Sequence, residues 1–117
     1  MSDVEQRCAD LDAMTAKGEM LDALTAFYAE DCTFTEVADG SSRANRQDQH
    51  DHLSGFFSTL KGFNGATLHS SAVSGDTSLS EWTFDMTGGD GSSIVWNEVL
   101  VRRWRDGRVV EERFYNP

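Results

Sequence analysis

The chain has 117 residues and a formal net charge of −10, from 20 acidic and 10 basic residues. Hydrophobic residues make up 38% of the sequence and aromatic residues 10%, which favours a folded chain with its own core over a disordered one. The acidic balance argues against nucleic acid and anionic membranes as partners, because both require a cationic patch on the protein.

Two cysteines, Cys8 and Cys32, form neither a disulfide framework nor a metal-ligand spacing, so we expect buried, reduced thiols. The N-terminus is acidic and has no apolar run, and no stretch approaches the ~20 apolar residues of a membrane span. These features predict a single cytoplasmic domain over residues 1–117.

Three helices are expected in the first half of the chain. A capping box at residues 2–5 opens the first, which ends near Gly18, and the second covers residues 19–29. The third begins at Asn45, a typical N-cap residue, and is expected to end at residues 62–65. Its apolar stripe follows helical spacing and consists of Leu53, Phe56, Phe57 and Leu60.

Strands are predicted from period-two alternation and turn residues, with a polar loop at residues 38–43. Asp106-Gly107 lies between two β-prone runs and predicts a tight hairpin, because a two-residue primed turn needs positive φ at its centre. The expected strands are 32–37, 66–74, 78–87, 93–105 and 108–115. Helices followed by hairpin-linked strands predict an α+β fold in which the helices cover one face of an antiparallel sheet.

Three strings resemble SnoaL-like proteins of the nuclear transport factor 2-like superfamily, which also holds ketosteroid isomerases, polyketide cyclases and limonene epoxide hydrolase. They are residues 24–34, the phenylalanine-rich residues 53–60, and residues 99–110 with the Asp-Gly turn. The resemblance implies a cone, in which a strongly curved mixed or antiparallel sheet and the helices enclose a pocket. It also implies a homodimer through the outer face of the sheet.

Matching the last hairpin to the isomerase pattern places one alternating set of side chains in the cone and the valine-rich set, Val95, Val99 and Val101, outside. A register shift of one residue would reverse this assignment. The expected pocket is aromatic, suits a small apolar or aromatic ligand, and carries a few ionisable groups. Its predicted ligand-binding residues are Phe56, Phe57, Trp82, Phe84, Trp96, Glu98, Trp104, Glu112 and Phe114.

Glu36 resembles the general-base carboxylate of the isomerases, and a solvated glutamate at a strand end is the alternative. Burial in an apolar cavity would raise the pKa of such a carboxyl toward the range useful for proton abstraction. Arg102 could receive a ligand oxygen, or could be a buried structural charge paired, for example, with Glu112. Tyr28 could donate to the same ligand, or could be a core tyrosine.

The rest of the isomerase site does not carry over, because Leu11 and Leu100 stand where the isomerases keep their two oxyanion donors. The acid of the epoxide hydrolase pattern would fall at Phe114. His50-Asp51-His52 is expected on a solvated helix face and not at a metal, and no cofactor is indicated.

Three hypotheses therefore stay open. The chain could catalyse cofactor-free acid–base chemistry, as an isomerase, cyclase or hydrolase of a small apolar carbonyl compound. It could instead bind a ligand without transforming it, or act as a dimeric protein-interaction domain.

Overall fold

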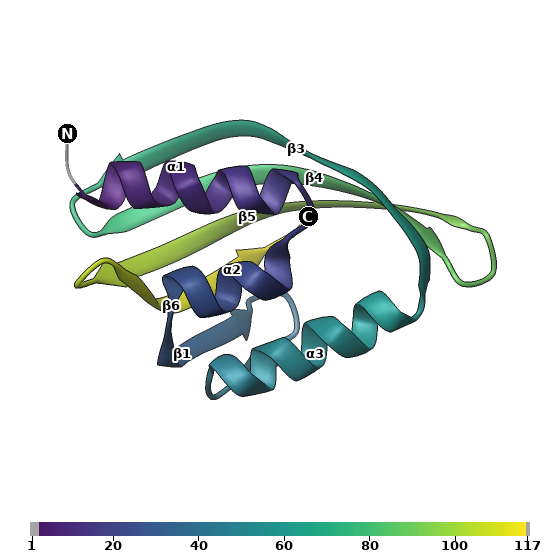
Figure 1. The fold of residues 1–117 in the computed structure, drawn as a ribbon, viewed down its shortest axis with the longest axis horizontal. Coiled ribbons are helices and arrows are strands. Elements are labelled where there is room, and N and C mark those ends of the chain that lie inside the picture. Colours follow the sequence, from purple (N-terminus) through teal and green to yellow (C-terminus); the bar gives the residue numbers. More distant parts are fainter. Residues whose placement is uncertain (1–2, 117) are drawn as a thin grey trace.

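A computed structural model describes residues 3–116, which form three helices and one six-stranded sheet (Figure 1). The helices are α1 (Asp3–Ala16), α2 (Met20–Phe27) and α3 (Arg46–Ser58). The strands are β1 (Tyr28–Glu36), β2 (Ser42–Arg43), β3 (Leu60–Ser74), β4 (Thr77–Gly88), β5 (Ser93–Arg105) and β6 (Arg108–Tyr115). Among these helices, none is long and apolar enough to cross a membrane.

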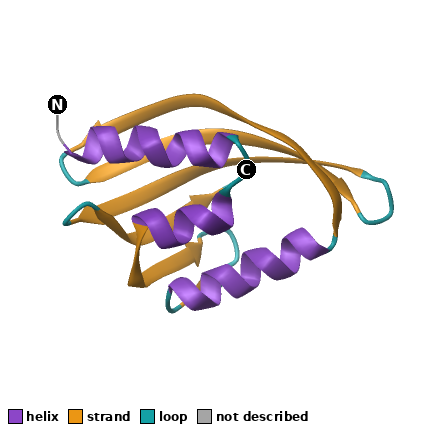
Figure 2. Ribbon diagram, in the orientation of Figure 1, coloured by secondary structure: helices purple, strands orange, loops and turns teal. Residues whose placement is uncertain are grey.

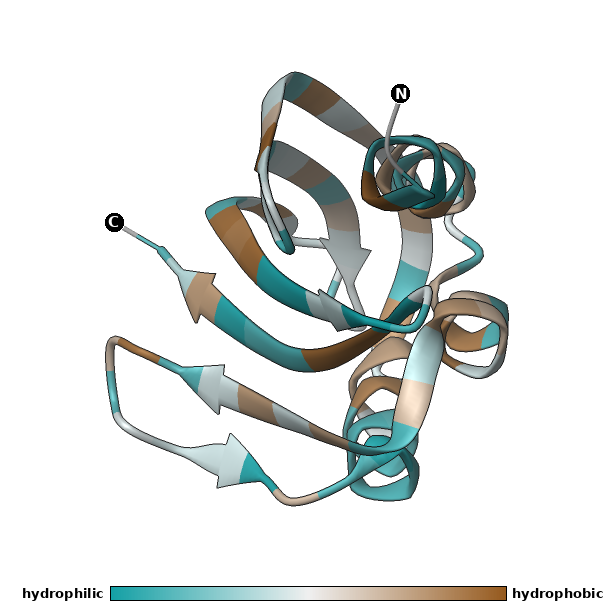
Figure 3. Ribbon diagram, turned by 90° about the vertical axis from the view of Figure 1, so that its left-hand side faces the viewer, coloured by the Kyte–Doolittle hydropathy of each residue, from teal (hydrophilic) through white to brown (hydrophobic). Residues whose placement is uncertain are grey.

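The sheet is a four-stranded meander extended by the first two strands, in the order β2-β1-β6-β5-β4-β3. All neighbouring pairs are antiparallel except β1 and β6, which run parallel. The sheet is therefore mixed, one of the two forms that the resemblance implies, because β1 follows α2 and joins the edge left open by the last strand. The sheet curves without closing, and all three helices lie on its concave side (Figures 2 and 3).

Alternation along the strands gives the sheet an inner and an outer face, as predicted. On β5, Leu100, Arg102 and Trp104 are buried, whereas Val95 and Asn97 are exposed. A register shift between β5 and β6 next to Trp104 changes the phase of β6, so that Val109 and Glu112 are both buried. Within the predicted inner set, Leu100, Arg102 and Trp104 are therefore buried and Glu98 is half-buried, whereas Trp96 is 45% exposed.

Several segments differ from their expected structure. Residues 28–29, expected to end the second helix, already belong to β1, which begins at Tyr28 and not at residue 32. Asn45 does cap α3, since its side chain accepts a hydrogen bond from the Asp48 amide, but the helix ends at Ser58. Residues 62–65 belong to β3, where register shifts accompany Gly62 and Gly65 and bend the strand. Part of the expected polar loop forms β2, which pairs with β1. Ser2, which opens the expected capping box, lies outside the described residues.

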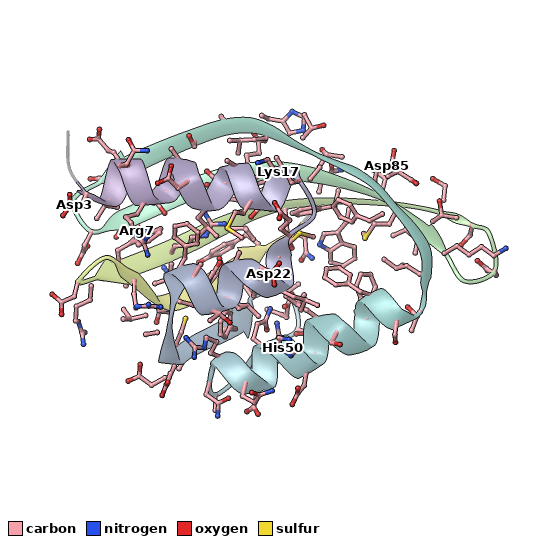
Figure 4. All side chains as sticks on the ribbon, viewed as in Figure 1. Asp3, Arg7, Lys17, Asp22, His50 and Asp85 are labelled. Atoms are coloured by element: carbon pink, nitrogen blue, oxygen red, sulfur yellow. The ribbon has the colours of Figure 1, made fainter. Side chains whose placement is uncertain are left out.

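Two arginines connect the last hairpin to the helices. The guanidinium of Arg7 lies over the Phe27 ring and donates to the Gly107 and Ala26 carbonyl oxygens. Figure 4 shows Arg7 on the side of α1 that faces α2. Arg108 donates to the carbonyl oxygens of Thr25 and Tyr28. Both side chains supply donors to carbonyls at the end of α2, where a helix has unsatisfied acceptors.

The Asp106-Gly107 turn has the geometry that the sequence predicts, with φ of 51° at Asp106 and 76° at Gly107. We expect Gly107→Ala to lower the free energy of unfolding by about 1 kcal/mol, because an L side chain is strained at positive φ. Gly55→Ala is the matched control: Gly55 lies within α3 with open space around its Cα, so alanine should stabilise by roughly 0.5–1 kcal/mol. Urea denaturation measures both changes, and equal effects at the two positions would contradict the assignment of strain to the turn.

Candidate functional site

A cavity of about 420 Å³ lies between the concave face of the sheet and helices α2 and α3. Its walls are mostly apolar, with side chains from both helices and from β1, β4, β5 and β6. Figure 4 shows side chains filling the space between the sheet and the helices. The aromatic residues that line the cavity are Tyr28, Phe56, Phe57, Phe63, Phe84, Trp96 and Phe114.

The predicted site residues separate into two groups. Trp82 and Trp104 lie in the core and are not among the cavity-lining residues. Trp82 is stacked on Phe84, and Trp104 donates its indole N–H to the Ser78 hydroxyl at 2.9 Å. Alternation placed both tryptophans on the inner face, but it could not tell core from cavity wall. The predicted residues that do line the cavity are Tyr28, Glu36, Phe56, Phe57, Phe84, Trp96, Glu98, Arg102, Glu112 and Phe114.

Arg102 is held by two buried carboxylates. Its side chain is 1% exposed, and its Nε donates to Glu112 Oε2 at 2.7 Å. Its Nη1 donates to Asp12 Oδ1 at 2.9 Å and contacts the Ser80 hydroxyl at 3.3 Å. A guanidinium this deeply buried requires such partners, since an unpaired buried charge is costly. The structure therefore agrees with the paired alternative, in which Arg102 holds the fold together.

Asp12 was missed by the sequence analysis. It is 4% exposed and also accepts a hydrogen bond from the Ser80 hydroxyl at 2.9 Å. Its position carried a signal, because Cys8, Leu11, Asp12 and Thr15 share one helical stripe and all four are buried. An acid within an apolar stripe indicates a buried cation opposite it.

Tyr28 belongs to the same network. Its hydroxyl donates to Glu112 Oε2 at 2.6 Å. Burial raises the pKa of Tyr28 well above its usual value, and the neighbouring Glu112 carboxylate raises it further. The phenol is therefore neutral, and its proton is committed to Glu112.

Glu36 is paired with a residue that the sequence analysis left in a loop. Arg43 Nη2 contacts Glu36 Oε2 at 2.7 Å, while Arg43 Nε donates to Gln49 Oε1 at 2.7 Å. Arg43 also lies over the Phe114 ring. The guanidinium of Arg43 therefore occupies one oxygen of the Glu36 carboxylate. The pairing of β2 with β1 brings Arg43 beside Glu36, and no local pattern in the sequence predicts it.

Glu98 has no such partner. Among residues 3–116, no Lys, Arg or His nitrogen lies within salt-bridge distance of its carboxylate. It accepts one hydrogen bond, from the Trp96 indole N–H at 2.8 Å. Burial raises the pKa of Glu98 to about 7; the bond from Trp96 opposes this shift, and the charges of Glu112 and Glu36 add to it. Glu98 is thus the cavity carboxyl that can both give and take a proton near neutral pH.

The histidines of α3 are not arranged around a metal. His52 lines the cavity, and His50 lies 3.7 Å from its neighbour Asp51. Within the described part of the chain, no group of three or more His, Cys, Asp or Glu side chains is placed to hold a metal ion.

The sequence matches the SnoaL-like domain family over residues 10–112. Because the match covers most of the chain, the chain belongs to the SnoaL-like family, and its helices and curved sheet form the cone expected of this family. A comparison with curated proteins gives no match.

Solved structures share this fold at low sequence identity. A nuclear transport factor 2-like protein of unknown function from Burkholderia pseudomallei is 17% identical with a TM-score of 0.82, covering 100% of this chain and 92% of that one. TerC, co-crystallised with polyporic acid, is 13% identical with a TM-score of 0.80 over 99% and 92% of the two chains. A ketosteroid isomerase-like protein from Catenulispora acidiphila, in complex with trimethylamine, is 16% identical with a TM-score of 0.73 over 88% and 79%.

The paired state of Arg102 leads to a stability prediction. Arg102→Met leaves Asp12 and Glu112 buried without their cation, so we expect the free energy of unfolding to fall by about 3–5 kcal/mol. The neighbouring Arg103 is the matched control: it lies on the outer face with 55% of its side chain exposed and pairs loosely with Glu111. Arg103→Met should cost less than about 1 kcal/mol. Chemical denaturation measures both losses, and similar values would contradict the structural role of Arg102.

Proposed function

We propose that this protein binds a small, largely apolar organic molecule in its cone, with one polar group of the ligand against Glu98. The supporting observation is the position of Glu98, a carboxyl with no cationic partner in an aromatic wall. A cavity of about 420 Å³ is within the range of small-molecule sites. The family is consistent with such a role, since two proteins of the same fold hold small molecules in their crystals.

Ligand binding is favoured over catalysis by the state of the other polar groups. Tyr28 donates its proton to Glu112, and the Nε and Nη1 donors of Arg102 are taken by Glu112 and Asp12. An enzyme that forms an enolate needs donors aimed at the developing charge. In this cavity the Tyr28 hydroxyl and the Nε and Nη1 groups of Arg102 already donate to carboxylates of the protein.

A second candidate function is acid–base catalysis on a small apolar carbonyl compound. It is supported by the pKa of about 7 at Glu98, because a general base works best when its pKa lies near the operating pH. In this hypothesis Glu98, and not Glu36, removes a proton next to the carbonyl. Glu36 would then serve, with Arg43, to shape the cavity.

One set of experiments tests both functions. A panel of small aromatic and alicyclic ketones is added to protein in H2O, and binding is followed by the indole N–H resonance of Trp96, with those of Trp82 and Trp104 as internal references. We expect Trp96 to shift and, at pH 6, Glu98→Leu to weaken binding by about fivefold to tenfold, because leucine cannot donate the hydrogen bond that the protonated carboxyl gives to the ketone oxygen. Glu81→Leu, the same substitution on the outer face, is the control and should have no effect.

Exchange of the ketones' α-hydrogens for deuterium, followed in parallel samples prepared in D2O, reports catalysis. Protein-dependent exchange that falls by roughly 10²–10⁴-fold in Glu98→Gln would support the enzyme. Binding without exchange would support the ligand-binding function. If no member of the panel perturbs Trp96, the binding function fails for neutral ligands of this kind.

We also propose that the protein forms a homodimer through the outer face of the sheet. Apolar side chains gather there, with Val95 57%, Leu79 40% and Tyr115 38% exposed. Leu79 is the register partner of Val101, and Val99 is the register partner of Tyr115, so these side chains form one patch across three strands. A patch of this kind on an otherwise charged surface is typical of an interface.

Analytical ultracentrifugation checks this proposal. The protein should sediment as a dimer at micromolar concentration, and Leu79→Lys should shift it toward monomer, because a charge would be buried at the interface. Glu81→Lys, on the same face of the same strand, tests whether any lysine on that face has this effect. A wild-type monomer at this concentration would refute the dimer.

A further inference from the structure

The charges around the cavity are unbalanced. Four carboxyls line it, from Glu36, Asp39, Glu98 and Glu112, against two guanidiniums, from Arg43 and Arg102. Asp12 lies behind the wall and takes a second contact from Arg102. The cavity is therefore an acidic environment, within a protein whose net charge is −10.

Both guanidiniums are already paired with carboxylates of the protein. Arg43 is bound to Glu36 and to Gln49, each at 2.7 Å. Arg102 is bound to Glu112 at 2.7 Å and to Asp12 at 2.9 Å. A ligand carboxylate that approached either guanidinium would also approach the carboxylates already bound to it, and their like charges would repel it.

Glu98, in contrast, is a carboxyl without a cationic partner among the described residues, so its negative charge can attract a cationic ligand. Its one hydrogen bond comes from Trp96, a neutral donor, and Trp96 itself lines the cavity. Further aromatic side chains on the same wall and on α3 include Phe84, Phe56 and Phe57. Aromatic faces attract cations, most strongly when water is excluded, and a carboxylate among such rings is the chemistry that recognises an alkylated ammonium group.

We propose that the ligand of this cavity is an organic cation, a tertiary or quaternary ammonium whose apolar substituents contact the aromatic rings while its charge lies against Glu98. This inference rests on the proposed binding function and names the ligand class for it. Glu98 supplies the charge complementarity, and the aromatic rings supply the contact area. The carboxylates already paired with Arg43 and Arg102 disfavour an anionic ligand of the same size.

The inference implies that binding depends on pH. The ionisable groups that share the cavity with Glu98 are Glu36 from β1, Asp39 from the following loop, Arg43 from β2, His52 from α3, Arg102 from β5 and Glu112 from β6. Glu98 loses its proton as the pH rises through its pKa of about 7, so its affinity for a permanent cation increases with pH. Between pH 6 and pH 8 we expect an increase of up to roughly tenfold, the change in the ionised fraction of one such carboxyl.

The test compares three probes of similar size. Benzyltrimethylammonium is a permanent cation, neopentylbenzene is its neutral isostere, and phenylacetate is an anion. Affinities are measured by the Trp96 indole N–H resonance for the wild type, Glu98→Gln and the outer-face control Glu81→Gln. At pH 8 we expect the cation to bind at least tenfold more tightly than the neutral isostere, and phenylacetate most weakly.

Glu98→Gln should remove this preference and most of the pH dependence while leaving the neutral isostere unaffected. Glu81→Gln should behave as wild type. Equal binding of cation and neutral isostere would overturn the cation inference but leave the binding function intact. Tighter binding of phenylacetate, or a cation preference that survives Glu98→Gln, would also overturn it. If none of the probes binds, the inference and the binding function both fail for ligands of this size.

Discussion

The ion pairs of Arg102 are the interaction on which the rest of the structure depends. One guanidinium on β5 joins Asp12 of α1 and Glu112 of β6, and Glu112 in turn accepts the hydroxyl of Tyr28 at the start of β1. These contacts tie the helical layer to the sheet beneath it. Burial of a guanidinium is favourable only when such partners surround it, so the network requires α1 and the inner sheet face to meet in one arrangement.

The same network determines the character of the cavity. By taking the donors of Arg102 and the proton of Tyr28, it leaves the wall with few polar groups that a ligand can use. Glu98 remains, outside the network but close enough for the charge of Glu112 to raise its pKa. The structural charges are therefore satisfied among themselves, and Glu98 lies among aromatic rings without a cationic partner in the described part of the chain.

Much of this could be predicted from local patterns. The Asp106-Gly107 turn, the cap at Asn45 and the two faces of β5 each follow from the conformation or spacing of a few neighbouring residues. The Glu36–Arg43 pair could not be predicted, because it depends on a two-residue strand formed from a polar loop. The glycines of β3 were assigned to a helix end, since Gly62 and Gly65 interrupt a helix and bend a strand equally well.

The sequence by itself determined the order of the elements, the family and the side of the last hairpin that faces inward, because alternation and turn chemistry are local properties of the chain. Only the tertiary structure decided which inward side chains pack in the core and which reach open space, as Trp82 and Trp96 illustrate. It also decided which carboxyl has a cationic partner, as Glu36 has in Arg43, and which has none within residues 3–116, as is true of Glu98. The pKa of an acid depends on its burial and on the charges that other strands bring to it, and neither is encoded in its neighbours along the chain.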